Sequence, residues 1–126
     1  MSFAVPGDLG IKNVHGVRYY SADETFTDVV NAGTNSTVAE MRGFHNKIFY
    51  INNGSNQTVV FTIQSSPDIA FTDARTVGST ISVAASGKDE IHISDLHSYM
   101  RINIDPAADS TGTITINLRA QQGSTG

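Results

Sequence analysis

The chain has 126 residues and a formal net charge of −4, and only 16% of its residues are charged. The absence of cysteine excludes a disulfide scaffold, a cysteine-ligated zinc site and a thiol nucleophile. Eight scattered lysines and arginines against twelve acids argue against binding to a nucleic-acid backbone, and no apolar run approaches the roughly 18 residues of a membrane span.

Residues 1–11 are predicted to form an extended arm, because Pro6 and Gly7 interrupt any helix. The start is neither cationic nor followed by an apolar run, so we expect synthesis in the cytoplasm without a signal peptide. Ordering such an arm costs roughly 1–2 kcal/mol per residue in backbone entropy, so it must pack against its own domain, or against a neighbouring subunit or the particle surface. We favour a neighbouring subunit or the particle surface, contacted through four apolar side chains: Phe3, Val5, Leu9 and Ile11.

Strand-like segments follow at 14–20 and 25–30, separated by a predicted polar turn at 21–24, and residues 37–41 suit a short strand or one helical turn. Residues 47–51 are apolar on both faces, as in a central strand. Asn53-Gly54 is a strong tight-turn pair, which predicts a hairpin with the strand at 57–64.

Four later segments, 80–84, 90–94, 99–105 and 113–120, alternate between apolar and polar residues. The chain therefore predicts an all-β protein, an antiparallel β-sandwich of jelly-roll or immunoglobulin-like order, with seven to nine short strands and almost no helix. The sandwich is expected over residues 12–120, with a polar tail at 121–126. The predicted core consists of Phe49 or Tyr50, Phe61, Ile63, Ile102, Ile104, Ile114, Ile116 and Leu118.

The densest set of potential metal ligands is the segment 89–97. Glu90 and His92 share one face of a strand, but the neighbouring isoleucines take the core face, so His92 is expected to point to solvent. The acidic segment 105–112 lacks the ligand spacing of a calcium loop and suits a hairpin loop. With no nucleophile elbow and no phosphate-binding loop, we expect no enzyme activity, no cofactor and no metal.

The segments 49–54, 59–68, 81–87 and 98–104, with the alternating final strand, resemble the small β-sandwich structural proteins of tailed-phage particles. They are also similar to jelly-roll subunits of spore-surface appendages. The chain departs from the appendage subunits in having no cysteine for cross-links between subunits. The resemblance carries no catalytic residue.

We therefore predict a non-enzymatic, self-assembling structural subunit, a virion component of the capsid-decorating or tail-associated kind. Its predicted partners are copies of itself and other structural proteins of the particle, with no nucleic acid and no membrane. One alternative is a subunit of an extracellular or spore-surface filament. Another is a carbohydrate-binding module, for which the available aromatic residues are Tyr19, Tyr20, Tyr50 and Tyr99.

Overall fold

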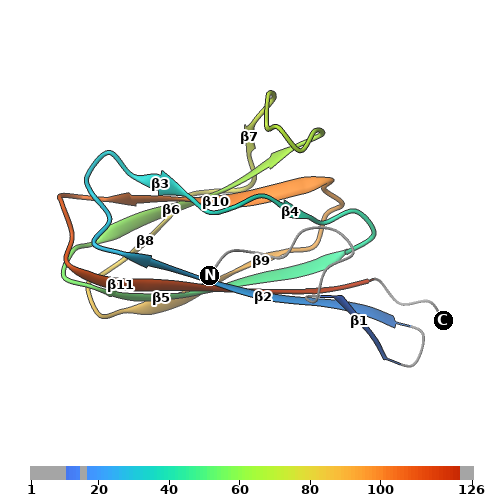
Figure 1. Ribbon diagram of the computed structural model, residues 1–126, viewed down its shortest axis with the longest axis horizontal. Coiled ribbons are helices and arrows are strands. Elements are labelled where there is room, and N and C mark those ends of the chain that lie inside the picture. The colour runs from blue at the N-terminus through green and yellow to red at the C-terminus, as the bar shows by residue number, and fades with distance from the viewer. Residues whose placement is uncertain (1–10, 15–16, 123–126) are drawn as a thin grey trace.

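The computed structural model describes residues 11–14 and 17–122, which form two antiparallel sheets packed face to face (Figure 1). One sheet has the strand order β1-β2-β11-β5-β9, namely β1 (Ile11–Val14), β2 (Val17–Thr27), β11 (Gly112–Gln121), β5 (Asn46–Ser55) and β9 (Lys88–Ile93). The centre of the other sheet is β10 (Tyr99–Pro106) beside β6 (Val59–Ser66). Two short strands, β3 (Thr34–Asn35) and β4 (Ala39–Glu40), pair with the free edge of β10, while β7 (Arg75–Thr76) and β8 (Ile81–Val83) pair with that of β6.

The connections define a jelly roll rather than an immunoglobulin-like sandwich. The chain changes sheet between β2 and β3, β4 and β5, β5 and β6, β8 and β9, β9 and β10, and β10 and β11. Apart from the edge strand β1, one sheet thus has the order β2-β11-β5-β9 and faces β3/β4-β10-β6-β7/β8, which is the order of two interlocked Greek keys. Within the described residues there is no helix, and eight strands have three or more residues. Of the three two-residue strands, β4 lies in the segment 37–41, for which a short strand was one of the two predictions, whereas β3 and β7 were not predicted.

The core lies between the sheets and confirms the predicted set of inward residues. Phe49 is fully buried and Tyr50 is 41% exposed, which settles the choice between them. The other predicted core residues are at most 1% exposed: Phe61, Ile63, Ile102, Ile104, Ile114, Ile116 and Leu118. Strand parity was therefore sufficient to predict the buried faces of β5, β6, β10 and β11.

The predicted hairpin at Asn53-Gly54 is wrong, because β5 and β6 lie in different sheets. The Asn53 side chain is buried and bonds to backbone groups instead of occupying a turn tip. Gly54 is a regular residue of β5, opposite Thr113, and a Cβ there would lie 2.5 Å from the Thr113 carbonyl oxygen. A glycine at position 54 is therefore explained by the close approach of β11. The chain crosses from one sheet to the other at residues 56–58.

Three further predictions, for the segments 21–24, 105–112 and 14–20, need correction. The polar segment 21–24 is not a turn, because β2 runs through it and buries Glu24, whose carboxylate accepts bonds of 3.1 Å from the Thr37 amide and hydroxyl. The segment 105–112 is not a hairpin loop, because it joins β10 of one sheet to β11 of the other. The predicted strand at 14–20 is divided between β1 and β2, which pair with Val14 opposite Val17.

Candidate interaction surface

The predicted arm joins the fold at the edge of a sheet. Phe3, Val5 and Leu9 lie outside the described residues, and Ile11 is the first residue of the edge strand β1. β1 pairs with β2 only from Val17 to Tyr20. Among the described residues no strand pairs with the same edge of β2 from Ser21 to Thr27, so this edge continues in line with the start of β1.

The strands run along the long axis of the sandwich and gather their loops at its two ends (Figure 1). We call one end the Leu96 end; it consists of the loops 41–45, 67–74 and 94–98. We call the other the Val30 end; it consists of the loops 28–33, 56–58, 84–87 and 107–111. In Figure 1 the Leu96 end is on the right and the Val30 end on the left.

The Leu96 end is held together by a buried lysine. Lys47 shares the core face of β5 with Phe49 and is 1% exposed. Its ammonium donates to the carbonyl oxygens of Phe44 at 2.9 Å and His45 at 3.1 Å, and to that of Asp95. One side chain thus ties the loop 41–45 to the loop 94–98. Desolvation lowers the pKa of Lys47 to about 8, although the Asp95 carboxylate opposes the shift.

Beside this lysine is a small hollow. Its volume is about 230 Å³, and it is lined by Arg42, Gly43, Leu96, His97 and Ser98. Leu96 is 62% exposed, the highest value among the large apolar side chains that the structure describes. The His97 Nε2 atom is buried without a hydrogen-bond partner, and burial together with the Lys47 charge lowers the pKa of that imidazole. His97 is thereby kept neutral, and the rim of this hollow is apolar at Leu96 and cationic at Arg42.

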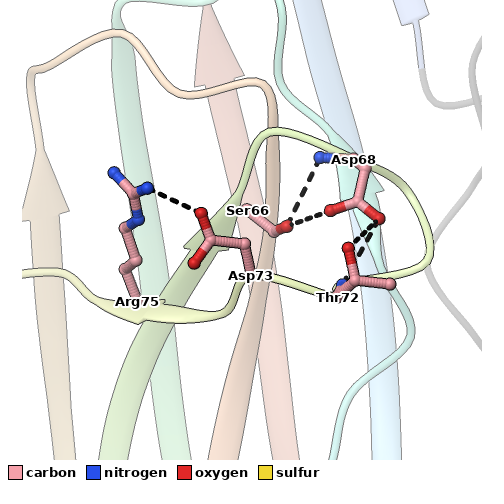
Figure 2. Close-up of polar contacts among 5 residues, drawn as sticks. All are labelled: Ser66, Asp68, Thr72, Asp73 and Arg75. Carbon is pink, nitrogen blue, oxygen red and sulfur yellow. Dashed lines mark hydrogen bonds and ion pairs between the residues drawn. The ribbon is translucent and has the colours of Figure 1, made fainter.

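The loop 67–74 follows the end of β6 and rises above the face of its sheet beside β7 (Figure 1). It is ordered by its own side chains (Figure 2). The Asp68 carboxylate accepts the Ser66 hydroxyl at 2.6 Å and the Thr72 hydroxyl at 2.8 Å. These two donors hold the pKa of Asp68 below its ordinary value. Further along, Asp73 and Arg75 form an ion pair of 2.6 Å. Hydrogen bonds and an ion pair between its own side chains therefore hold the conformation of this projecting loop.

The backbone of this projection is strained at Phe71. Phe71 has a φ of 55°, a left-handed conformation that a bulky residue rarely adopts. Its ring is buried beneath the Arg101 guanidinium, 4.3 Å from the ring centroid, and this contact holds the unusual conformation in place. The same loop leaves Ile69 56% exposed. The loop thus combines a strained backbone position with an exposed apolar side chain.

At the Val30 end, carboxylates bind the loops to one another. Asp28 accepts the Gly112 amide at 2.9 Å, and Asp109 accepts the Asn31 amide at 2.8 Å. A hollow of about 310 Å³ opens here, and Val30, 53% exposed, is on its rim. Its lining consists of apolar residues and glycine, namely Phe26, Val29, Val30 and Gly33, together with three polar residues, Thr27, Asp28 and Thr34.

The described residues offer no metal centre. Glu90 and His92 form an exposed pair of 3.3 Å on the outer face of the sheet, so His92 points to solvent as predicted. Across residues 11–14 and 17–122 no three histidines or acids are grouped as metal ligands would be. Within those ranges there is also no helix of the length and apolarity that crossing a bilayer requires.

Two of the four tyrosines are exposed on the outer face of the five-stranded sheet. Tyr19 is 37% exposed and Tyr50 is 41% exposed. Tyr20 is buried against the Phe44 ring, and Tyr99 lies beneath the Arg42 guanidinium at 5.6 Å. The aromatic surface that a sugar-binding face needs is therefore reduced to two separate side chains.

Sequence reasoning did not identify the residues that organise the two ends. The parity of β5 does contain the signal for Lys47, since Phe49 and Ile51 point inward and Lys47 is in phase with them. The roles of Leu96 and Val30 have no such signal, because each lies in a loop whose position depends on the order of the strands.

Comparison with known proteins gives similarity of fold. No protein-family model matches the chain, and no curated protein sequence does. A structure of the disulfide-linked pili that form Bacillus endospore appendages has a TM-score of 0.59 at 14% identity, covering 85% of this chain and 89% of that one. PirA has a TM-score of 0.53 at 17% identity, with 77% and 91% covered. The SPBc2 prophage-derived protein YomS has a TM-score of 0.50 at 10% identity, with 80% and 94% covered. The resemblance to appendage subunits and to a phage-derived protein is thus confirmed at the level of the fold.

Proposed function

We propose that this chain is a non-enzymatic structural subunit that assembles with copies of itself, and that residues 1–11 are the connecting arm. The observation that carries the proposal is the place where the arm joins the sandwich. It enters at Ile11, in an edge strand, and the adjoining edge of β2 has no strand partner between Ser21 and Thr27 within the described residues.

An unpaired strand edge presents a row of amide and carbonyl groups that accept another extended segment. Main-chain hydrogen bonds then supply affinity, and alternate side chains supply specificity. Full burial of an apolar side chain contributes about 1.5–3 kcal/mol, so Phe3, Val5, Leu9 and Ile11 together offset much of the entropy lost when the arm becomes ordered. The rest must come from the main-chain hydrogen bonds, so an arm from one copy connects to the sheet edge of another only if both its backbone and its apolar side chains are engaged.

Of the two settings that the fold suggests, a virion is the one we propose. The appendages with a similar fold are disulfide-linked pili, and this chain has no cysteine with which to form such links. Contacts between its copies are therefore non-covalent, as suits a capsid-decorating or tail-associated protein. A filament subunit held by non-covalent contacts is the alternative.

Deletion of residues 2–10 tests the role of the arm, with deletion of the polar residues 123–126 as the matched control. The truncated chain is expected to keep its melting temperature, because the described core lies outside the deleted segment. It is also expected to lose assembly in negative-stain images, whereas the control retains it. Assembly that survives the first deletion, or a monomer that unfolds because of it, contradicts the arm as connector.

A further inference from the structure

Charge is distributed unevenly along the long axis of the sandwich. Of the lysine and arginine side chains that the structure describes, all but Lys88 lie in the half nearer the Leu96 end: Arg18, Arg42, Lys47, Arg75, Arg101 and Arg119. The loops of the Val30 end contain Asp28 and Asp109 and no lysine or arginine. Asp105, the second-last residue of β10, lies next to the loop 107–111 at the same end. The molecule is therefore acidic at one end and mixed in charge at the other.

Three of the four carboxylates of the Leu96 end have partners, and the fourth, that of Asp95, is exposed in the loop 94–98. Asp73 pairs with Arg75, Glu40 with Arg42 at 2.7 Å, and the Asp68 carboxylate accepts two hydroxyl groups. At this end Arg42 remains 63% exposed at the rim of the hollow. Arginines neutralise two of these carboxylates, those of Glu40 and Asp73. An acidic surface brought against this end therefore meets the exposed Arg42 and is opposed mainly by Asp68 and Asp95.

Exposed apolar side chains mark the same two ends. Leu96 and Ile69 are 62% and 56% exposed at the Leu96 end. At the Val30 end, Val30 is on the rim of a hollow whose lining includes Phe26 and Val29. Each end thus has an exposed apolar side chain at a hollow, and of these two hollows the one at the Val30 end has the larger volume and has a carboxylate, Asp28, in its lining.

We propose that copies of this chain stack end to end, so that the Leu96 end of one copy contacts the hollow at the Val30 end of the next. The proposal deepens the function proposed above, because it names a second contact between copies and gives the assembly a direction. The two surfaces differ, so the contact is heterologous and a row of copies continues to grow unless its rotation closes a ring. A stable contact buries about 1,200–2,000 Å² in total, so the surrounding loops of both ends take part along with the two central side chains.

The absence of cysteine allows a direct test by cross-linking the full-length chain. Leu96→Cys and Val30→Cys are introduced separately and together, and the proteins are treated with a short bismaleimide. The double variant is expected to give a ladder of multimers. An equal mixture of the two single variants is expected to stop at dimers, because each has one thiol. Leu96→Cys combined with Tyr50→Cys is the matched control, since Tyr50 is 41% exposed on a sheet face away from both ends, and it is expected to give no ladder.

A double variant that gives no ladder, or a control that cross-links equally well, overturns the end-to-end contact. Sedimentation of the untreated chain separates the two proposals. Assembly without the ladder contradicts only the end-to-end contact, whereas a chain that remains monomeric contradicts self-assembly as well. If a cysteine variant unfolds, p-benzoylphenylalanine at Leu96 of the full-length chain replaces it. Photo-cross-links that map to residues 28–33 of another copy then support the contact, and cross-links elsewhere overturn it.

Discussion

At the scale of the single residue, Lys47 shows how a charge is accommodated inside this sandwich. Three carbonyl oxygens from two loops surround its ammonium, which compensates for the loss of water around a side chain that is 1% exposed. Removal of the amine leaves those carbonyls without their donor. The residue thus orders the loops of the Leu96 end, and the form of that end depends on it.

The lowered pKa of Lys47 predicts a specific dependence of stability on pH. Its value of about 8 is below the 10.5 of an unperturbed lysine, so between these pH values the unfolded chain still binds the proton that the folded chain has released. The free energy of unfolding therefore gains a rising contribution from Lys47 across this window, of about 3 kcal/mol at most. Below pH 8 this contribution is constant.

The measurement compares denaturant unfolding of the wild type with that of Lys47→Met, a side chain of similar length that does not titrate. The difference in unfolding free energy between the two proteins is expected to be constant below pH 8 and to change in favour of the wild type from pH 8 to 10.5. A difference that stays flat over that range contradicts the burial of the ammonium.

At the scale of the element, the crossing from β5 to β6 depends on Asn53. Its amide donates to the carbonyl oxygens of Gln57 at 2.9 Å, Val83 at 2.9 Å and Ala84 at 3.1 Å. Its oxygen accepts the Ser55 amide at 3.1 Å and hydroxyl at 2.6 Å. The side chain therefore connects the end of β5 to the end of β8, and so joins the two sheets where the chain passes between them.

Asn53→Asp is expected to destabilise the protein by about 3 kcal/mol or more. A carboxylate has no N–H to donate, so carbonyl oxygens lose their donor and face a buried negative charge. The neighbouring Asn52 is exposed, and Asn52→Asp makes the same chemical change on the outer face of the sheet. It is expected to alter the unfolding free energy by less than about 0.5 kcal/mol. Equal effects of the two substitutions in denaturant titrations contradict the role given to Asn53.

Sequence alone was sufficient for the strands whose burial alternates and insufficient where a distant partner decides the structure. The alternation over 113–120 predicts β11 and its buried face, because parity is a local property of the chain. Asn53-Gly54 is a local signal for a turn, but the amide partners Val83 and Ala84 are about thirty positions away. In the same way, the segment 21–24 has the composition of a turn, and only the bonds from Thr37 explain how Glu24 is buried in a strand.

At the scale of the whole molecule, the assembly proposed above uses two kinds of surface of the jelly roll. One is the sheet edge where residues 1–10 join the fold at Ile11, beside the β2 edge from Ser21 to Thr27. The other is the pair of unlike ends, one acidic with an apolar hollow and the other projecting Leu96. Because the two ends are different surfaces, the contact between them is heterologous and does not close after two copies. Assemblies built from them are expected to extend as rows or lattices of copies.

The central claim is that copies of this chain associate with one another, and sedimentation velocity of the purified full-length protein over a hundredfold range of concentration tests it most directly. The account predicts a sedimentation coefficient that rises with concentration and a distribution that extends to species much larger than a dimer. A single species at the mass of 13.5 kDa throughout that range contradicts it.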